Sequence, residues 1–213
     1  MLRHIASELK EHIPFTAVGA VTGIVIMVAI VLGNVPASVS EVAFDVFHPL
    51  HVLLSALVTT AMFRKHRHGN IWVAIAIGYS GSVGIATLSD SIIPYLGGAL
   101  LGADMHFHVG FIEEWWLVNP LALIGIIAGY LKPTTKFPHA GHVLVSTWAS
   151  LFYFTAFGTA PWLSLLLPLV FIFLFLAVWL PCCISDIVFP LLFTGNIAHP
   201  EGIIYNQHQQ GGK

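Results

Sequence analysis

The chain has 213 residues, of which 57% are hydrophobic and 8% are charged, and its mean hydropathy is +0.86. A soluble domain usually carries about 25% charged residues, so a single soluble core would not hide this much apolar surface. A net charge of −2 without a basic patch argues against nucleic-acid binding, and the two adjacent cysteines, Cys182 and Cys183, provide no disulfide framework.

Apolar runs close to the ~20 residues that cross a bilayer recur along the whole chain. We therefore predict an all-α integral membrane protein, a single polytopic domain over residues 1–213 with a bundle of about six transmembrane helices. The more polar residues 1–13 are expected to form a short interfacial helix. The predicted spans cover residues 15–35, 44–63, 71–88, 115–131, 143–158 and 162–184.

The basic residues give an orientation for this topology. With six spans, every Lys and Arg falls on one side of the membrane, and the positive-inside rule then places both termini inside. These residues are Arg3, Lys10, Arg64, Lys65, Arg67, Lys132, Lys136 and Lys213. We expect the plasma or inner membrane of a prokaryote as the host membrane.

The second predicted span carries a polar stripe in an otherwise apolar segment. At about 100° per residue, one helix face collects the polar side chains of this span, with Asp45 at its edge. Lipid offers no hydrogen bonds, so this face is expected to contact protein or water. The stripe consists of His48, His51, Ser55, Thr59 and His66.

Residues 89–114 are predicted to form a ligand-rich loop on the outer face, after a third span that ends near residue 88. The six-span topology brings this loop beside Asp45, His48 and His51. The loop carries Asp90, Asp104, His106, His108, Glu113 and Glu114. The same topology assigns a second set to the inner face: His66, His68, His139, His142, Cys182, Cys183 and Asp186. Headgroup contact is the expected role of these histidines, and the two cysteines are expected to act as small apolar residues.

The outer residues are of the types that bind divalent metals. Neutral imidazoles and carboxylates are the usual ligands of zinc, iron and manganese. We predict a metal site with ligands drawn from His48, His51, Asp90, Asp104, His106 and His108. Glu113 or Glu114 is the expected general base acting on metal-bound water. Hydration at the membrane interface is the competing explanation for each residue taken singly.

Several functions fit this pattern. A metal-dependent hydrolase acting on a lipid or lipid-linked substrate is favoured, because the predicted span interiors carry no charge. A divalent transition-metal transporter or channel would instead place ionisable ligands near the midplane. A b-type haem electron carrier and a structural subunit of a membrane complex stay open as well. The expected partners are the lipid bilayer, a lipid-like substrate or a metal ion, and a homo-oligomer or larger complex.

Three short motifs add to this picture. The order Asp45-x-x-His48-Pro49, His66-Arg67 and Asp90-x-x-x-Pro94 loosely resembles a family of bacterial integral-membrane metal-dependent hydrolases, although Phe47 replaces a second Asp of that family and its Thr-His-Ser is missing. Glu113-Glu114 followed by His139 and His142 faintly resembles intramembrane prenyl-type proteases, without their Arg after the Glu pair. Each likeness covers too little of the chain to assign a family. Residues 88–94 (LSDSIIP) also echo residues 184–190 (ISDIVFP), which chance explains equally well.

Overall fold

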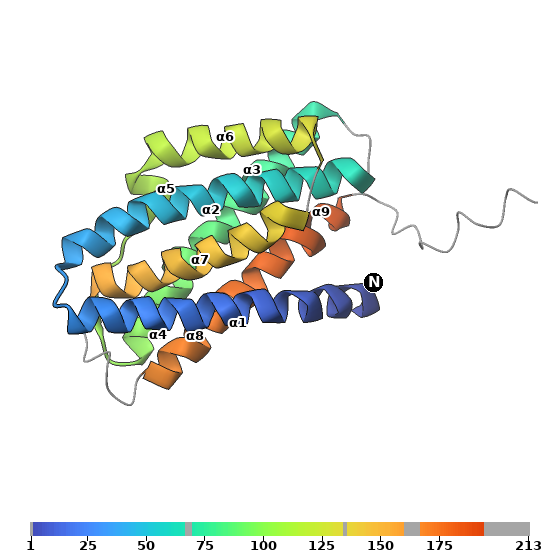
Figure 1. The fold of residues 1–213 in the computed structure, drawn as a ribbon. Helices are drawn as coiled ribbons and strands as arrows, with labels where there is room; N and C mark the ends of the chain where they lie inside the picture. The colour runs from blue at the N-terminus through green and yellow to red at the C-terminus, as the bar shows by residue number, and fades with distance from the viewer. Residues whose placement is uncertain (1, 67–69, 134–135, 160–166, 194–213) are drawn as a thin grey trace, which may run out of the picture.

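The structure is a computed structural model that describes residues 2–66, 70–133, 136–159 and 167–193, and these residues are almost entirely helical (Figure 1). The longer helices are α1 (Leu2–Leu32), α2 (Ala37–His66), α3 (Ile71–Thr87), α6 (Trp115–Leu131), α7 (Lys136–Phe157) and α8 (Leu167–Cys183). The shorter helices are α4 (Ile93–Leu100), α5 (Gly110–Glu113) and α9 (Phe189–Leu192). Two π-helical turns, η1 (Leu88–Ile92) and η2 (Ile184–Val188), and a ribbon of β1 (Asp104–Met105) and β2 (Gly158–Thr159) complete the described part.

The predicted membrane character has direct support from helix length and composition. Three helical segments are long and apolar enough to cross a bilayer: Ile13–Leu32, Ala37–Lys65 and Ile71–Leu100. Two shorter apolar helices, Trp115–Leu131 and Leu167–Cys182, lie beside them. The prediction of a helical membrane protein is confirmed at this level, and the number of spans stays a prediction. Residues 2–14 do not form a separate helix, because α1 runs unbroken from Leu2 to Leu32.

The predicted end of the third span is wrong. The helix does not stop near residue 88, because η1 and α4 continue α3 as far as Leu100. Asp90 therefore lies inside a candidate span, and most of the expected loop is helix. Pro94 stands in the first turn of α4. In a regular α-helix its ring would clash with the carbonyl four residues earlier, and the wider π turn relieves that crowding.

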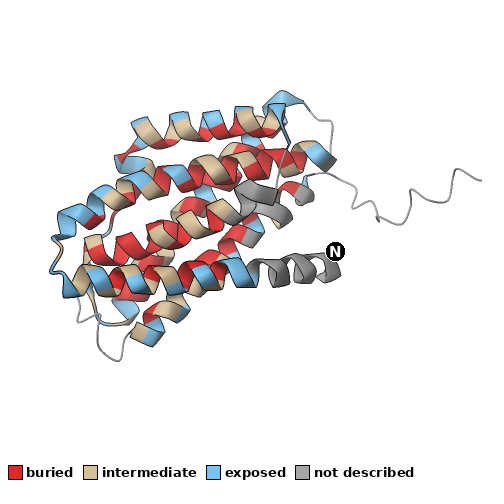
Figure 2. Cartoon of the chain, in the orientation of Figure 1, coloured by how far each residue is buried: buried red, intermediate tan, exposed pale blue. Residues whose placement is uncertain are grey.

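Helix α2 lies at the centre of the bundle. It packs most extensively against α7, α6 and α3 (Figure 1). Gly125 and Gly129 of α6 lie directly against the backbone carbonyls of Leu53 and Leu57, where a larger side chain would not fit. Small residues allow such close helix contact in membranes. Buried residues follow the inner faces of α2 and α7, and the outer faces of the bundle are exposed (Figure 2).

The sequence echo has a structural counterpart. Residues 88–94 and residues 184–190 both form a π turn that leads into a short α-helix with proline near its start. Ser89 and Ser185, the matching serines of the two turns, are both fully buried. π turns are rare and often lie at functional sites. The part of α2 that contacts the two turns is therefore a candidate functional region.

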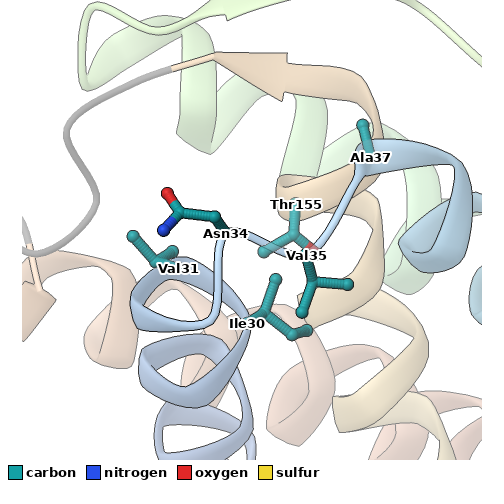
Figure 3. Close-up of a pocket in the computed structure, with 6 residues that line it drawn as sticks. All are labelled: Ile30, Val31, Asn34, Val35, Ala37 and Thr155. Carbon is teal, nitrogen blue, oxygen red and sulfur yellow. The ribbon is translucent and has the colours of Figure 1, made fainter.

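A surface pocket of about 330 Å³ lies between the α1–α2 turn and α7 (Figure 3). Its lining is mainly apolar and includes Ile30, Val35 and Thr155. Asn34 forms its rim in the left-handed conformation, with φ of 49°, which asparagine tolerates better than most residues. Among the described residues that line it, none is a His, Cys, Asp or Glu, so the lining includes none of the predicted metal ligands.

Candidate metal centre

Asp90 lies at the centre of a fully buried polar network. Its Oδ2 accepts hydrogen bonds from Nδ1 of His48 at 3.0 Å and from Nδ1 of His51 at 2.7 Å. Its Oδ1 accepts from the hydroxyls of Ser89 at 2.7 Å and Ser146 at 2.9 Å. Both carboxylate oxygens are thus engaged by α2, α7 and η1 itself. The network assigns the Nδ1–H tautomer to both rings, which leaves each Nε2 as a lone-pair donor.

His51 belongs to a group that we call the thiol cluster, made of His51, His142 and Cys182. One ligand atom from each residue lies within 4.8 Å of the others, and all three residues are buried. Cys182 Sγ is 3.9 Å from His51 Nε2. The rings of His51 and His142 stack with their centroids 5.6 Å apart. The cluster joins α2, α7 and α8 in the interior of the bundle.

A second group, the carboxylate cluster, is made of Asp45, His108 and Glu114, again with ligand atoms within 4.8 Å. His108 Nε2 is 3.4 Å from Glu114 Oε1. Among the described residues, the buried oxygens Asp45 Oδ1 and Glu114 Oε2 have no hydrogen-bond partner. Asp45 and Glu114 also lie within hydrogen-bonding reach of each other. Buried polar atoms are nearly always satisfied, and either a proton shared by the two carboxyl groups or a bound cation would satisfy these oxygens.

Glu113 stands behind His108. Its Oε2 is 3.0 Å from His108 Nδ1, and its Oε1 accepts a hydrogen bond from the backbone N–H of Val109 at 3.2 Å. The side chain of Glu113 is 52% exposed. Glu113 therefore orients the His108 ring towards Glu114 and holds the start of α5. The two glutamates predicted as alternative bases thus occupy different positions in the structure.

Within the carboxylate cluster, His108 and Glu114 act on each other electrostatically. Burial lowers the pKa of His108, but the contact with Glu114 and the negative charge of Glu113 outweigh it, and the net effect raises that pKa. Burial raises the pKa of Glu114, but the contacts with His108 outweigh it, and the net effect lowers that pKa. Glu114 therefore favours the ionised form beside His108, and a metal ion bound by His108 would have to displace the proton of the imidazole.

Two predicted ligands lie outside both clusters. Asp104 and His106 are exposed and line an open pocket beside β1 and β2, together with Glu41. The hydroxyl of Tyr153 accepts a hydrogen bond from the N–H of His108 and donates one to the carbonyl of His106. This hydroxyl fixes a bend between the two histidines, so only His108 enters the bundle. The structure gives Asp104 and His106 no contact with a cluster.

The assignment of His142 and Cys182 to the opposite membrane face from His51 is wrong. Helix α7 begins at Lys136, so His142 is well inside the helix, and α2 begins at Ala37, so His51 is too. A buried polar run on α7 was the available signal. His142, Ser146 and Ser150 recur every fourth residue and are fully buried. The side chains of His66, His68, His139, Cys183 and Asp186 lie outside the described residues.

The polar face of α2 continues beyond the thiol cluster. Ser185 of η2 lies 3.2 Å from the hydroxyl of Ser55 and 3.3 Å from that of Thr59, and it donates a hydrogen bond to the carbonyl of Gly81. Both polar residues of α2 are buried. The stripe predicted from helical periodicity therefore faces protein, as expected, at each of its described positions.

The histidines share one arrangement. The Nδ1 atoms of His48 and His51 contact Asp90, and that of His108 contacts Glu113. Metal-binding histidines almost always direct one ring nitrogen to such a partner, which fixes the ring and strengthens the other nitrogen as a ligand. The part of the chain that the structure describes thus contains two groups that could hold a metal ion. No family model, curated protein or solved structure matches this chain in our comparisons.

Proposed function

We propose that this chain transports divalent transition-metal ions through its helix bundle, with the carboxylate cluster and the thiol cluster as successive binding sites. One observation carries the proposal: both clusters take a ligand from the polar side of α2, with Asp45 at one edge of that side and His51 at the other. Asp45 and His51 are six residues apart in the sequence, which separates their backbone positions by ~9 Å along the helix. His48 lies between them and shares Asp90 with His51.

The depth of the ligands favours transport over surface chemistry. Helix α2 has 30 residues, and His51 stands near its middle. Asp90 is likewise inside the segment Ile71–Leu100. Ionisable side chains within membrane helices usually mark a substrate or ion pathway, and transporters bind their cargo near the bilayer midplane. The Ser55, Thr59 and Ser185 hydroxyls extend the polar line beyond the thiol cluster.

The ligand types set the class of cargo. Imidazole, thiolate and carboxylate together suit zinc, iron(II) and cobalt(II), whereas calcium and magnesium prefer oxygen ligands alone. We propose zinc or iron(II) as the cargo, with manganese binding at the carboxylate cluster.

A metal-dependent hydrolase is the second candidate, favoured by the position of the carboxylate cluster. That cluster includes the half-buried Asp45 and lies beside the exposed carboxylate of Glu113, so it has access to solvent. A lipid or lipid-linked substrate is the class that such a site would meet at a membrane surface. This function would need the carboxylate cluster and would be indifferent to the thiol of Cys182.

The proposed topology keeps six spans with both termini inside, in the plasma or inner membrane of a prokaryote. The start of α1 and the ends of α2 and α6 lie at the same end of the bundle (Figure 1). Lys65 and Lys132 stand at these helix ends, in agreement with the positive-inside orientation.

Metal uptake by proteoliposomes tests the proposal. Purified protein would be reconstituted with a zinc-sensitive dye inside the vesicles, and zinc, cobalt(II), iron(II) and manganese would be added outside. We expect uptake by the wild type and by His106→Ala, and loss of uptake in Cys182→Ser and His51→Ala. Absence of uptake from a folded, metal-loaded wild type would overturn transport. A lipid hydrolase activity that survives Cys182→Ser would instead establish the second candidate.

A further inference from the structure

We propose that His48 is the fourth ligand of the carboxylate cluster, through Nε2, and that Asp90 holds the ring in that position. The resulting centre has two imidazoles, from His48 and His108, and two carboxylates, from Asp45 and Glu114. This inference takes from the proposed function only that the cluster binds a metal, and it is independent of transport.

The first argument is an unpaired buried nitrogen. His48 is fully buried, and its Nδ1 is held by Asp90. Its Nε2, on the far side of the ring, has no hydrogen-bond partner among the described residues. A buried polar atom without a partner loses the hydrogen bonds it would make in water, which is unfavourable. An acceptor-type nitrogen in this state indicates that a cation or a donor belongs beside it.

The second argument is the direction in which Nε2 points. Gly110 lies against the ring edge: a Cβ placed on it would be 2.6 Å from His48 Cδ2 and 3.0 Å from Nε2. Gly110 begins the short helix α5, between His108 and Glu114. The free edge of the ring therefore faces the segment that carries two members of the cluster.

The third argument is that one aromatic ring spans both imidazoles. Phe44 stacks on His48 with centroids 5.2 Å apart, and its edge meets His108 at 5.4 Å. Asp45 precedes His48 by one turn on the same helix, so their side chains share a face. Asp45 and His48 thus approach the cluster from α2, and His108 and Glu114 approach it from the α5 region.

The ligand set defines the class of metal. Two imidazoles and two carboxylates suit zinc, iron(II), manganese and cobalt(II). The lack of a thiolate separates this centre from the thiol cluster, which favours softer ions. The Asp90 oxygens accept hydrogen bonds from His48 Nδ1, His51 Nδ1 and the hydroxyls of Ser89 and Ser146. None of these is a proposed metal-binding atom of the centre, so Asp90 is a positioning residue.

Cobalt(II) binding in a Cys182→Ser background tests the proposal, because removal of the thiol weakens the competing cluster. We expect His48→Ala and His48→Gln to lower cobalt affinity more than Asp90→Asn. Asp90→Asn is expected to lower it about 10- to 100-fold, as for other outer-shell partners of metal-bound histidines. His106→Ala is the matched control, since His106 lies in the same segment as His108 but outside the cluster. The cobalt affinity of this variant should be unchanged.

X-ray absorption on the zinc-loaded Cys182→Ser protein counts the imidazoles bound to each zinc ion. A purely structural role of His48 would not change this number. We expect two imidazoles per zinc, and one in His48→Gln. A single imidazole before any change at His48, or unchanged cobalt affinity in a folded His48→Gln protein, would overturn the proposal. If the His48 variants do not fold, NMR of labelled histidine in the Cys182→Ser protein provides the test. We expect the His48 Nε2 signal to shift when zinc binds, and an unchanged signal would overturn the proposal. These measurements of metal binding are independent of the uptake assay that tests transport.

Discussion

The thiol cluster and the carboxylate cluster take ligands from one helix, α2, yet they differ in burial and in chemistry. The thiol cluster is closed on all sides and offers a thiol and two imidazoles. The carboxylate cluster reaches solvent through the half-buried Asp45 and offers two carboxylates and an imidazole. An accessible, harder site followed by an enclosed, softer one is an arrangement that suits capture and then transfer of a metal ion.

Asp90→Ala should have the largest effect, because it removes the acid that holds both buried histidines of α2, His48 and His51. Two buried imidazoles would lose their Nδ1 partner and two serine hydroxyls their acceptor. A hydrogen bond to a charged group contributes about 1.5–3 kcal/mol, and Asp90 accepts several. We expect a loss of this size in unfolding experiments in detergent micelles, and loss of metal from both clusters. Asp104→Ala, the change of an exposed acid, is the control. Equal stability of the two variants would contradict a central role of Asp90.

Cys182→Ser should separate the clusters. The thiolate is the only sulfur ligand among the described members of either group, so cobalt(II) bound to the wild type should show sulfur-to-metal charge-transfer absorption that this variant lacks. Combination with Cys183→Ser, compared with Cys183→Ser alone, assigns the band to one thiol. Cadmium affinity should fall more than manganese affinity, because thiolates prefer soft ions. A full band in the double variant would show that no thiol takes part.

Gly110→Ala should affect the carboxylate cluster alone. The added methyl group would meet the His48 ring at 2.6 Å, so the ring or α5 must move. We expect about a tenfold loss of cobalt affinity at this cluster, at the low end for changes in the support of a metal ligand. The cobalt–thiolate band of the thiol cluster should be unchanged. Its parallel loss would mean that the two sites are not separable.

Glu113→Gln should give the smallest change. The amide oxygen can still accept from His108, but the negative charge that raises the pKa of His108 is gone. The pKa of His108 in the metal-free variant should therefore fall, as measured by NMR titration of labelled histidine. Metal affinity should drop by a few-fold at most. A pKa that does not move would show that Glu113 has no electrostatic influence on His108.

The sequence was sufficient to predict the polar face of α2. His48, His51, Ser55 and Thr59 follow helical periodicity, and each is buried. The position of Asp90 was not predictable in this way. Proline and glycine after residue 93 resemble a loop signal, whereas a π turn lets the helix continue through them. One local irregularity thus moved the key acid from the expected surface to the interior.

The partners of His51 were missed for a different reason. His142 and Cys182 come from helices far along the chain, and local periodicity says nothing about which helices meet or at what depth. His106 and His108 show the converse problem. They are two residues apart and looked equivalent, but hydrogen bonds to Tyr153 direct only one of them inward.

The bond between Asp90 and the α2 histidines also bears on how the chain enters the membrane during synthesis. An isolated aspartate at the centre of a membrane helix opposes insertion by about 2.5–3.5 kcal/mol. Helix α2 is synthesised before α3 and packs directly against it. His48 and His51 are therefore already present when Asp90 leaves the ribosome, and the two helices can insert together as a hairpin that shields the acid. Because α2 precedes α3 in the chain, the histidines that hold Asp90 in the folded protein can also lower the cost of inserting this acid into the membrane.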